Sequence, residues 1–169
     1  MSRTFNITAD CKPSLHYMVD ITDRLEKIKK MIDAGQYFTI NRARQYGKTT
    51  TLRALAKYLI QDYVVVSLDF QLMSHKDFAE EGTFVKAFAE AVLRKVSGED
   101  AMPAEIRREL QKLIGDSQEA ALSRLFEILS TWCRISKKPI ILIIDEVDSA
   151  SNNQVFLDFL SQLRGYYID

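Results

Sequence analysis

The chain has 169 residues, a length that predicts one domain with a core large enough to form without disulfides or a structural metal. A hydrophobic fraction of 47% and a charged fraction of 27% are typical of globular proteins and argue against a disordered or fibrous chain. The 23 lysines and arginines balance the 23 aspartates and glutamates, so net charge gives no reason to expect nucleic acid as a partner.

Segments of helical and strand-like periodicity alternate along the chain, which is typical of a layered α/β fold. Apolar spacing predicts, in chain order, a helix over 23–34, a strand over 37–41, a helix over 49–61, a strand over 63–70, helices over 83–96, 104–114 and 117–135, a strand over 139–145 and a helix over 152–164.

The number of cysteines and the length of the apolar runs indicate in which compartment of the cell the protein is located. Cys11 and Cys133 are too few for a disulfide framework and are expected to be reduced thiols. The N-terminal residues lack the apolar segment of a secretory signal. The longest apolar run, 140–144, is much shorter than the roughly 20 residues that a membrane helix needs. We therefore expect a cytoplasmic protein with no membrane segment.

The segment between the predicted strand at 37–41 and the helix at 49–61 contains half of a phosphate-binding motif. Gly47-Lys48-Thr49 matches the end of G-x-x-x-x-G-K-[ST], whereas Arg42 stands where the first glycine is expected. In such a loop the glycine lets the backbone approach a phosphate, the lysine reaches the β- and γ-phosphates, and the threonine hydroxyl binds Mg²⁺. A chance occurrence of this tripeptide is the alternative, and its position between a strand and a helix favours the motif.

Local charge also favours an anion site near this loop. No acidic residue lies between Asp33 and Asp62, whereas five basic residues do. These are Arg42, Arg44, Lys48, Arg53 and Lys57. A solvated basic helix face is the alternative, and it explains Arg53 and Lys57 better than it explains Lys48.

A second candidate segment is the apolar strand at 139–145, which ends in Asp145 and is followed by Glu146. Ligands bind α/β sheets at the carboxyl ends of the strands, where Asp145 could hold Mg²⁺ and Glu146 could polarise an attacking water as general base. The alternative is that the two acids only begin a turn. The occurrence of both segments in this order favours a nucleotide site.

The two segments resemble P-loop NTPases of the division with an additional strand and a catalytic glutamate. More narrowly, NRARQYGKTT at 41–50 resembles the basic loop of a prokaryotic AAA-ATPase-like family, in which the first glycine is also absent. HYMVDI at 16–21 and DEVDSASNNQVFLDFLSQLRGYY at 145–167 resemble that family too. The resemblance implies ATP and Mg²⁺ as ligands. It implies a binding loop of Arg44, Gln45, Tyr46, Gly47, Lys48, Thr49 and Thr50, metal ligands Thr49 and Asp145, and catalytic residues Lys48 and Glu146.

The resemblance also implies a three-layer P-loop NTPase fold with a mainly parallel central sheet. In that division a later strand with a polar sensor residue lies between the lysine-loop strand and the Asp-Glu strand. Because no strand is predicted after residue 146, we expect a fold truncated at its C-terminal side. A compact variant in which the two strands pair directly is the alternative. The expected parts are a lead-in segment over 1–36 and an ATPase core over 37–169.

The expected function is ATP binding, with hydrolysis of the β–γ bond in the full-length protein. The alternatives are a nucleotide-gated switch or scaffold with little turnover, and an inactive fragment. Expected partners are ATP, a protein partner or second copy, and a nuclease-like domain further along the full-length chain. Two weaker site candidates are Asp69, either near the site or a turn cap, and the residues at 16–18, either beside adenine or in ordinary packing.

Overall fold

The computed structural model describes residues 19–41, 47–96, 98, 100–116, 118–147, 150 and 153–168, with residues 167 and 168 described by their backbone alone. Contacts within the chain define two compact units, Met1–Gln61 and Asp62–Asp169. The expected division into 1–36 and 37–169 stays a prediction.

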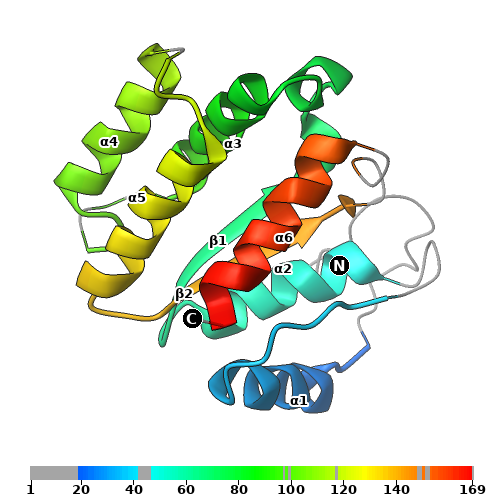
Figure 1. The fold of residues 1–169 in the computed structure, drawn as a ribbon. Coiled ribbons are helices and arrows are strands. Elements are labelled where there is room, and N and C mark those ends of the chain that lie inside the picture. Colours follow the sequence, from blue (N-terminus) through cyan, green and yellow to red (C-terminus); the bar gives the residue numbers. More distant parts are fainter. Residues whose placement is uncertain are drawn as a thin grey trace, which may run out of the picture. The chain divides into compact units, whose positions relative to one another are not determined.

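The first unit contains the helices α1 (Thr22–Asp33) and α2 (Lys48–Leu59), shown in Figure 1. Each helix buries one apolar stripe; that of α1 includes Leu25 and Ile28. α1 ends just before Gly35, which takes the left-handed conformation with φ 63° and so closes the helix. The helices predicted over 23–34 and 49–61 are confirmed.

The prediction of a strand over 37–41 is wrong. Residues 36–41 are described and take part in no ladder. The described residues of the first unit contain no strand that could exchange backbone hydrogen bonds with this segment. Strand propensity measures how well a residue fits beside a neighbouring strand, so the residue types at 37–41 do not produce a strand alone.

The second unit contains the parallel strands β1 (Val64–Asp69) and β2 (Ile140–Asp145). Their register pairs Val64 with Ile140 at one end and Asp69 with Asp145 at the other. Parallel neighbours need a long crossover, and helices supply it here. The α/β class is therefore confirmed, and the described sheet has two strands. The three-layer P-loop arrangement stays a prediction.

One face of this sheet contributes to the apolar core of the unit. Alternate residues of the two strands lie in that core or pack against it: Val64, Val66, Leu68, Ile140, Leu142 and Ile144. Because side chains alternate along a strand, the positions between them face the other side of the sheet, and Asp69 and Asp145 are among these.

Four helices belong to the same unit: α3 (Glu81–Lys95), α4 (Ala104–Gly115), α5 (Leu122–Ile135) and α6 (Gln154–Ile168). In Figure 1, α3, α4 and α5 lie side by side and contact one another, and α6 contacts α5. Amphipathic spacing predicted the presence of all four helices. It did not predict the two short 3₁₀ turns between β1 and α3, η1 (Phe70–Leu72) and η2 (His75–Phe78).

Helix α5 begins at Leu122, five residues after the predicted start at 117. The Leu122 N–H donates to Oε1 of Glu81 at 2.7 Å. Glu81 lies in the first turn of α3, so its carboxylate lies at the N-terminal end of two helices. A carboxylate in this position satisfies a backbone donor that the helix itself leaves without a partner. This long-range contact stabilises the first turn of α5.

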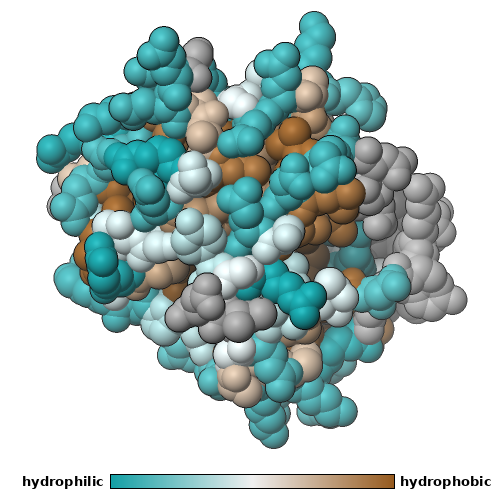
Figure 2. Space-filling view, in the orientation of Figure 1, coloured by the Kyte–Doolittle hydropathy of each residue, from teal (hydrophilic) through white to brown (hydrophobic). Residues whose placement is uncertain are grey.

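Aromatic rings from the helices and from η1 fill the core. Phe159 of α6 is fully buried, with its ring centroid 5.0 Å from that of Phe88 and 5.2 Å from that of Phe84. Phe70 lies 5.4 Å from Phe156 in an edge-to-face arrangement. Such pairs add to the free energy gained from burial alone. In Figure 2, hydrophilic residues cover most of the visible face, and hydrophobic side chains show in the gaps between them.

Among the helices in the described part of the chain, none has the length and apolar character that crossing a membrane requires.

Substitution of Phe159 by alanine should lower the free energy of unfolding of the second unit by about 3–5 kcal/mol, because it leaves a cavity among several rings. Trp132, the single tryptophan, is 1% exposed and serves as the fluorescence probe in urea. Leu157→Ala, on the same helix but 46% exposed, should cost less than about 1 kcal/mol. Equal losses for the two variants would contradict the packing described here.

Candidate functional site

Gly47, the second glycine position of the phosphate-loop motif, lies at the N-terminus of α2. Gly47 is the N-cap residue and has φ 71° and ψ 29°, in the left-handed region. A Cβ atom there would meet no atom within 4 Å, so the backbone angle and not crowding favours glycine. The first helical hydrogen bond runs from the Thr51 N–H to the Gly47 carbonyl oxygen at 2.9 Å.

Three of the predicted loop residues form the first turn of α2. Lys48 begins the helix, and Thr49 and Thr50 follow it. No acidic residue lies in this turn, so the positive end of the helix dipole is not offset by a carboxylate of the turn itself. The first N–H groups of a helix have no partner within the helix, and with the dipole they favour an anion.

The remaining loop residues, Arg44, Gln45 and Tyr46, lie outside the described residues, as do Arg42 and the candidates at 16–18.

The second part of the candidate site lies at the carboxyl ends of β1 and β2. The register places Asp69 beside Asp145, and Asp145 is 7% exposed. Each aspartate accepts a backbone hydrogen bond from the residues that follow it. Oδ1 of Asp69 accepts the Gln71 N–H at 3.0 Å, and Oδ1 of Asp145 accepts the Glu146 N–H at 2.9 Å. The capping interpretation of Asp69 is thereby confirmed, and its role near a ligand stays a prediction.

Glu146 has φ 57°, and it is the one non-glycine residue with positive φ in the described part of the chain. A left-handed conformation is uncommon for a residue with a side chain and costs about 1–2 kcal/mol. The sequence gives no signal for it, since asparagine, aspartate and glycine are the residues usually found in this region. Residues with backbone strain of this kind occur more often at functional sites than elsewhere.

The residue types at these two places fit a magnesium nucleotide. Mg²⁺ in such sites is held by one or two protein oxygens together with phosphate oxygens. A hydroxyl at Thr49 and a carboxylate at Asp145 are donors of that kind. Over the ranges that the structure describes, no cluster of three or more histidine, cysteine, aspartate or glutamate side chains could hold a metal ion by itself. Lys48 and Thr49 belong to the first unit, and Asp145 and Glu146 to the second.

A family model described as an AAA-like domain matches residues 13–169. The chain belongs to this AAA-like family. Searches of curated proteins and of solved structures give no significant match. The expected resemblance to an AAA-like family is confirmed at this level. Membership of the additional-strand division of P-loop NTPases stays a prediction.

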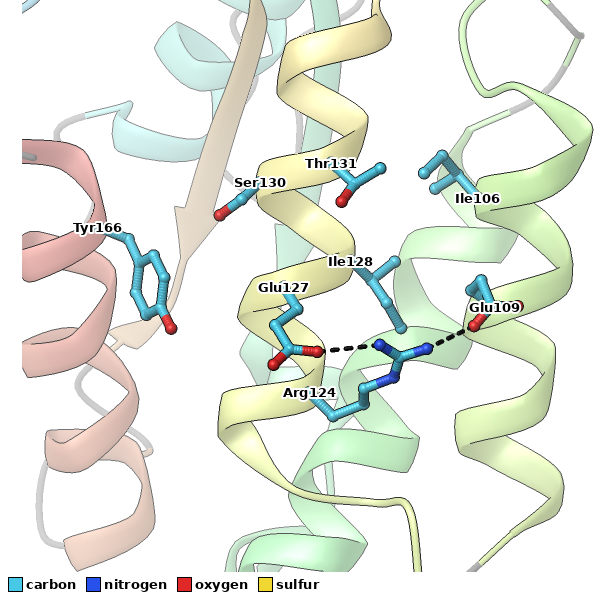
Figure 3. A pocket seen from close by; sticks show the side chains of 8 residues that line it. All are labelled: Ile106, Glu109, Arg124, Glu127, Ile128, Ser130, Thr131 and Tyr166. Carbon is cyan, nitrogen blue, oxygen red and sulfur yellow. Dashed lines mark hydrogen bonds and ion pairs between the residues drawn. The ribbon is translucent and has the colours of Figure 1, made fainter.

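The AAA-like chain also has a surface hollow that sequence reasoning did not predict. It has a volume of about 440 Å³ and lies on α4, α5 and the end of α6 (Figure 3). Arg124 crosses it between two carboxylates, 2.6 Å from Glu109 and 2.9 Å from Glu127. The hydrogen bond from Lys112, together with the charge of Arg124, holds the pKa of Glu109 below its usual value.

None of the predicted site residues lines this hollow. The i, i+3 spacing of Arg124 and Glu127 is visible in the sequence, whereas the pairing of Arg124 with Glu109 across two helices is not. Arg124 is already paired on both sides, so the hollow offers no cation that is ready to receive an anionic ligand.

Replacing Asp69 by alanine should lower the stability of the AAA-like chain by about 1 kcal/mol, because the Gln71 N–H loses its acceptor. Asp69→Asn keeps an oxygen acceptor and should stay close to the wild type in thermal unfolding. If asparagine destabilised the chain as much as alanine, the charge of Asp69 and not its cap would be what matters.

Proposed function

We propose that this AAA-like domain binds Mg-ATP at the N-terminus of α2 and, in the full-length protein, hydrolyses the β–γ bond. The observation that carries the proposal is Gly47 in the left-handed conformation directly before Lys48 and Thr49 at the start of a helix. That conformation is costly for most other residues and lets the backbone turn toward a phosphate. Membership of the AAA-like family supports the same function.

Each residue of the helix start has a distinct task in this proposal. The Lys48 ammonium binds the β- and γ-phosphates and stabilises the negative charge that develops as the bond between them breaks. The Thr49 hydroxyl is a metal ligand, and Thr50 contacts the α-phosphate. Arg44, Gln45 and Tyr46 belong to the same proposed phosphate-binding loop. The excess of basic residues in the segment from 34 to 61 supports binding of a polyanion.

The strand end supplies the acidic residues. Asp145 is the second protein ligand of the metal, and Glu146 accepts a proton from the attacking water. When bound, Mg²⁺ neutralises charge on the β- and γ-phosphates. Because Asp145 is 7% exposed, its carboxylate is largely shielded from bulk water, which strengthens its attraction for a cation.

Lys48→Ala should weaken binding of a fluorescent ATP analogue at least tenfold, because a charged hydrogen bond to phosphate is worth about 1.5–3 kcal/mol. The matched control is Lys57→Ala, which removes an equal charge from the last turn of the same helix and should leave affinity within about twofold. Unchanged binding in the Lys48 variant would remove the basis for a phosphate site at α2.

Glu146→Gln should keep ATP affinity and lower steady-state phosphate release at least a hundredfold, since a positioned general base contributes about 10²–10⁴ to rate. Glu119→Gln, at an exposed acidic residue, is the control and should retain turnover. Full activity in the Glu146 variant would disprove its role as base. A wild-type chain that binds ATP without releasing phosphate would instead identify a nucleotide-gated switch or scaffold.

A further inference from the structure

The end of β2 breaks the alternation of side chains at Glu146. Ile140, Leu142 and Ile144 pack against the core, so strict alternation would direct residue 146 into the core and residue 147 away from it. In the structure Val147 packs against the core, and Glu146 is partly exposed.

The neighbouring strand shows what happens without such a break. In β1, Val66 and Leu68 lie in the core, and the next residue of the same parity, Phe70, is 1% exposed in the same core. Asp69 and Asp145 are register partners, so Phe70 and Glu146 are the residues that follow equivalent positions. A carboxylate in the place of a buried phenylalanine ring would be very costly.

The left-handed conformation of Glu146 accounts for the difference between the two strands. With φ 57°, Glu146 leaves the extended conformation, and one such residue is enough to change which side chains face the core. Its N–H donates to Oδ1 of Asp145 at 2.9 Å, a local contact that can offset part of the cost of this conformation. In β1 the aspartate accepts its hydrogen bond from the N–H of Gln71, the second residue after it, and the alternation of side chains continues to Phe70.

We propose that Asp145 is a positioning residue for Glu146. By accepting the Glu146 N–H, it holds a left-handed turn that keeps the Glu146 carboxylate out of the core, at the carboxyl edge of the sheet, while Val147 takes the core position. The catalytic use of that carboxylate rests on the proposed function; the turn and its hydrogen bond do not. Asp145 would then serve both as a metal ligand and as the acceptor that orients the adjacent base.

Two comparisons in the chain without nucleotide test this role. The first compares Glu146→Gly with Glu146→Ala in thermal unfolding. Glycine adopts positive φ without strain, so we expect the glycine variant to unfold about 3 °C higher than the alanine variant. Glu119 has no positive φ, and there the order should be reversed or absent. An alanine variant at 146 as stable as the glycine variant would overturn the conformational part of the proposal.

The second comparison measures amide hydrogen exchange at Glu146 by NMR. Asp145→Ala removes the acceptor and should speed exchange at this amide about tenfold, whereas Asp145→Asn keeps an oxygen acceptor without the charge and should stay within about twofold of the wild type. Equal exchange in both variants would show that the side chain of residue 145 does not hold the turn. Neither measurement uses ATP, so failure of the Lys48 binding test and failure of this inference remain distinguishable.

Discussion

The register of the β1–β2 pair determines the positions of Asp69 and Asp145 at the ends of the two strands. Because the strands are parallel, they end at one edge, and Asp69 and Asp145 become neighbours there. A shift by one residue would move one aspartate to the face that packs on the phenylalanine core. The apolar positions on that face oppose such a shift, since it would turn their side chains away from the core and place a carboxylate against the phenylalanine rings. Packing on one side of the sheet therefore maintains the arrangement of carboxylates on the other.

The helices and the two central strands could be predicted from sequence because their signals are local. The amphipathic stripes of α3 and α4 and the apolar run of β2 are complete within their own segments. The start of α5 could not be predicted, since its first turn is stabilised by Glu81, a residue 41 positions earlier in the chain. The prediction of a strand at 37–41 was wrong for a related reason, because a strand needs a neighbouring strand that its own sequence does not specify.

The candidate site also contains features that its sequence reveals and features that it does not. The glycine at 47 is visible in the sequence as part of the motif, and the structure gives it a positive φ, which suits glycine. The conformation of Glu146 follows from no motif. It can be explained only by comparing the ends of the two strands. Phe70, directly after Asp69, lies in the core, whereas after Asp145 it is the second residue, Val147, that packs against the core. Pattern reasoning from one segment identifies which residues carry charge, whereas the direction in which they point depends on a neighbouring strand.

The Glu81 carboxylate has a consequence for how the second unit assembles. Its contact with the Leu122 N–H joins the first turn of α3 to the first turn of α5, although α4 and its connections lie between them in the chain. The first turn of α5 gains this acceptor only when α3 is already in place. The two helices therefore do not fray independently, and opening of one end exposes a donor at the other. Such mutual dependence contributes to cooperative unfolding of α3 and α5.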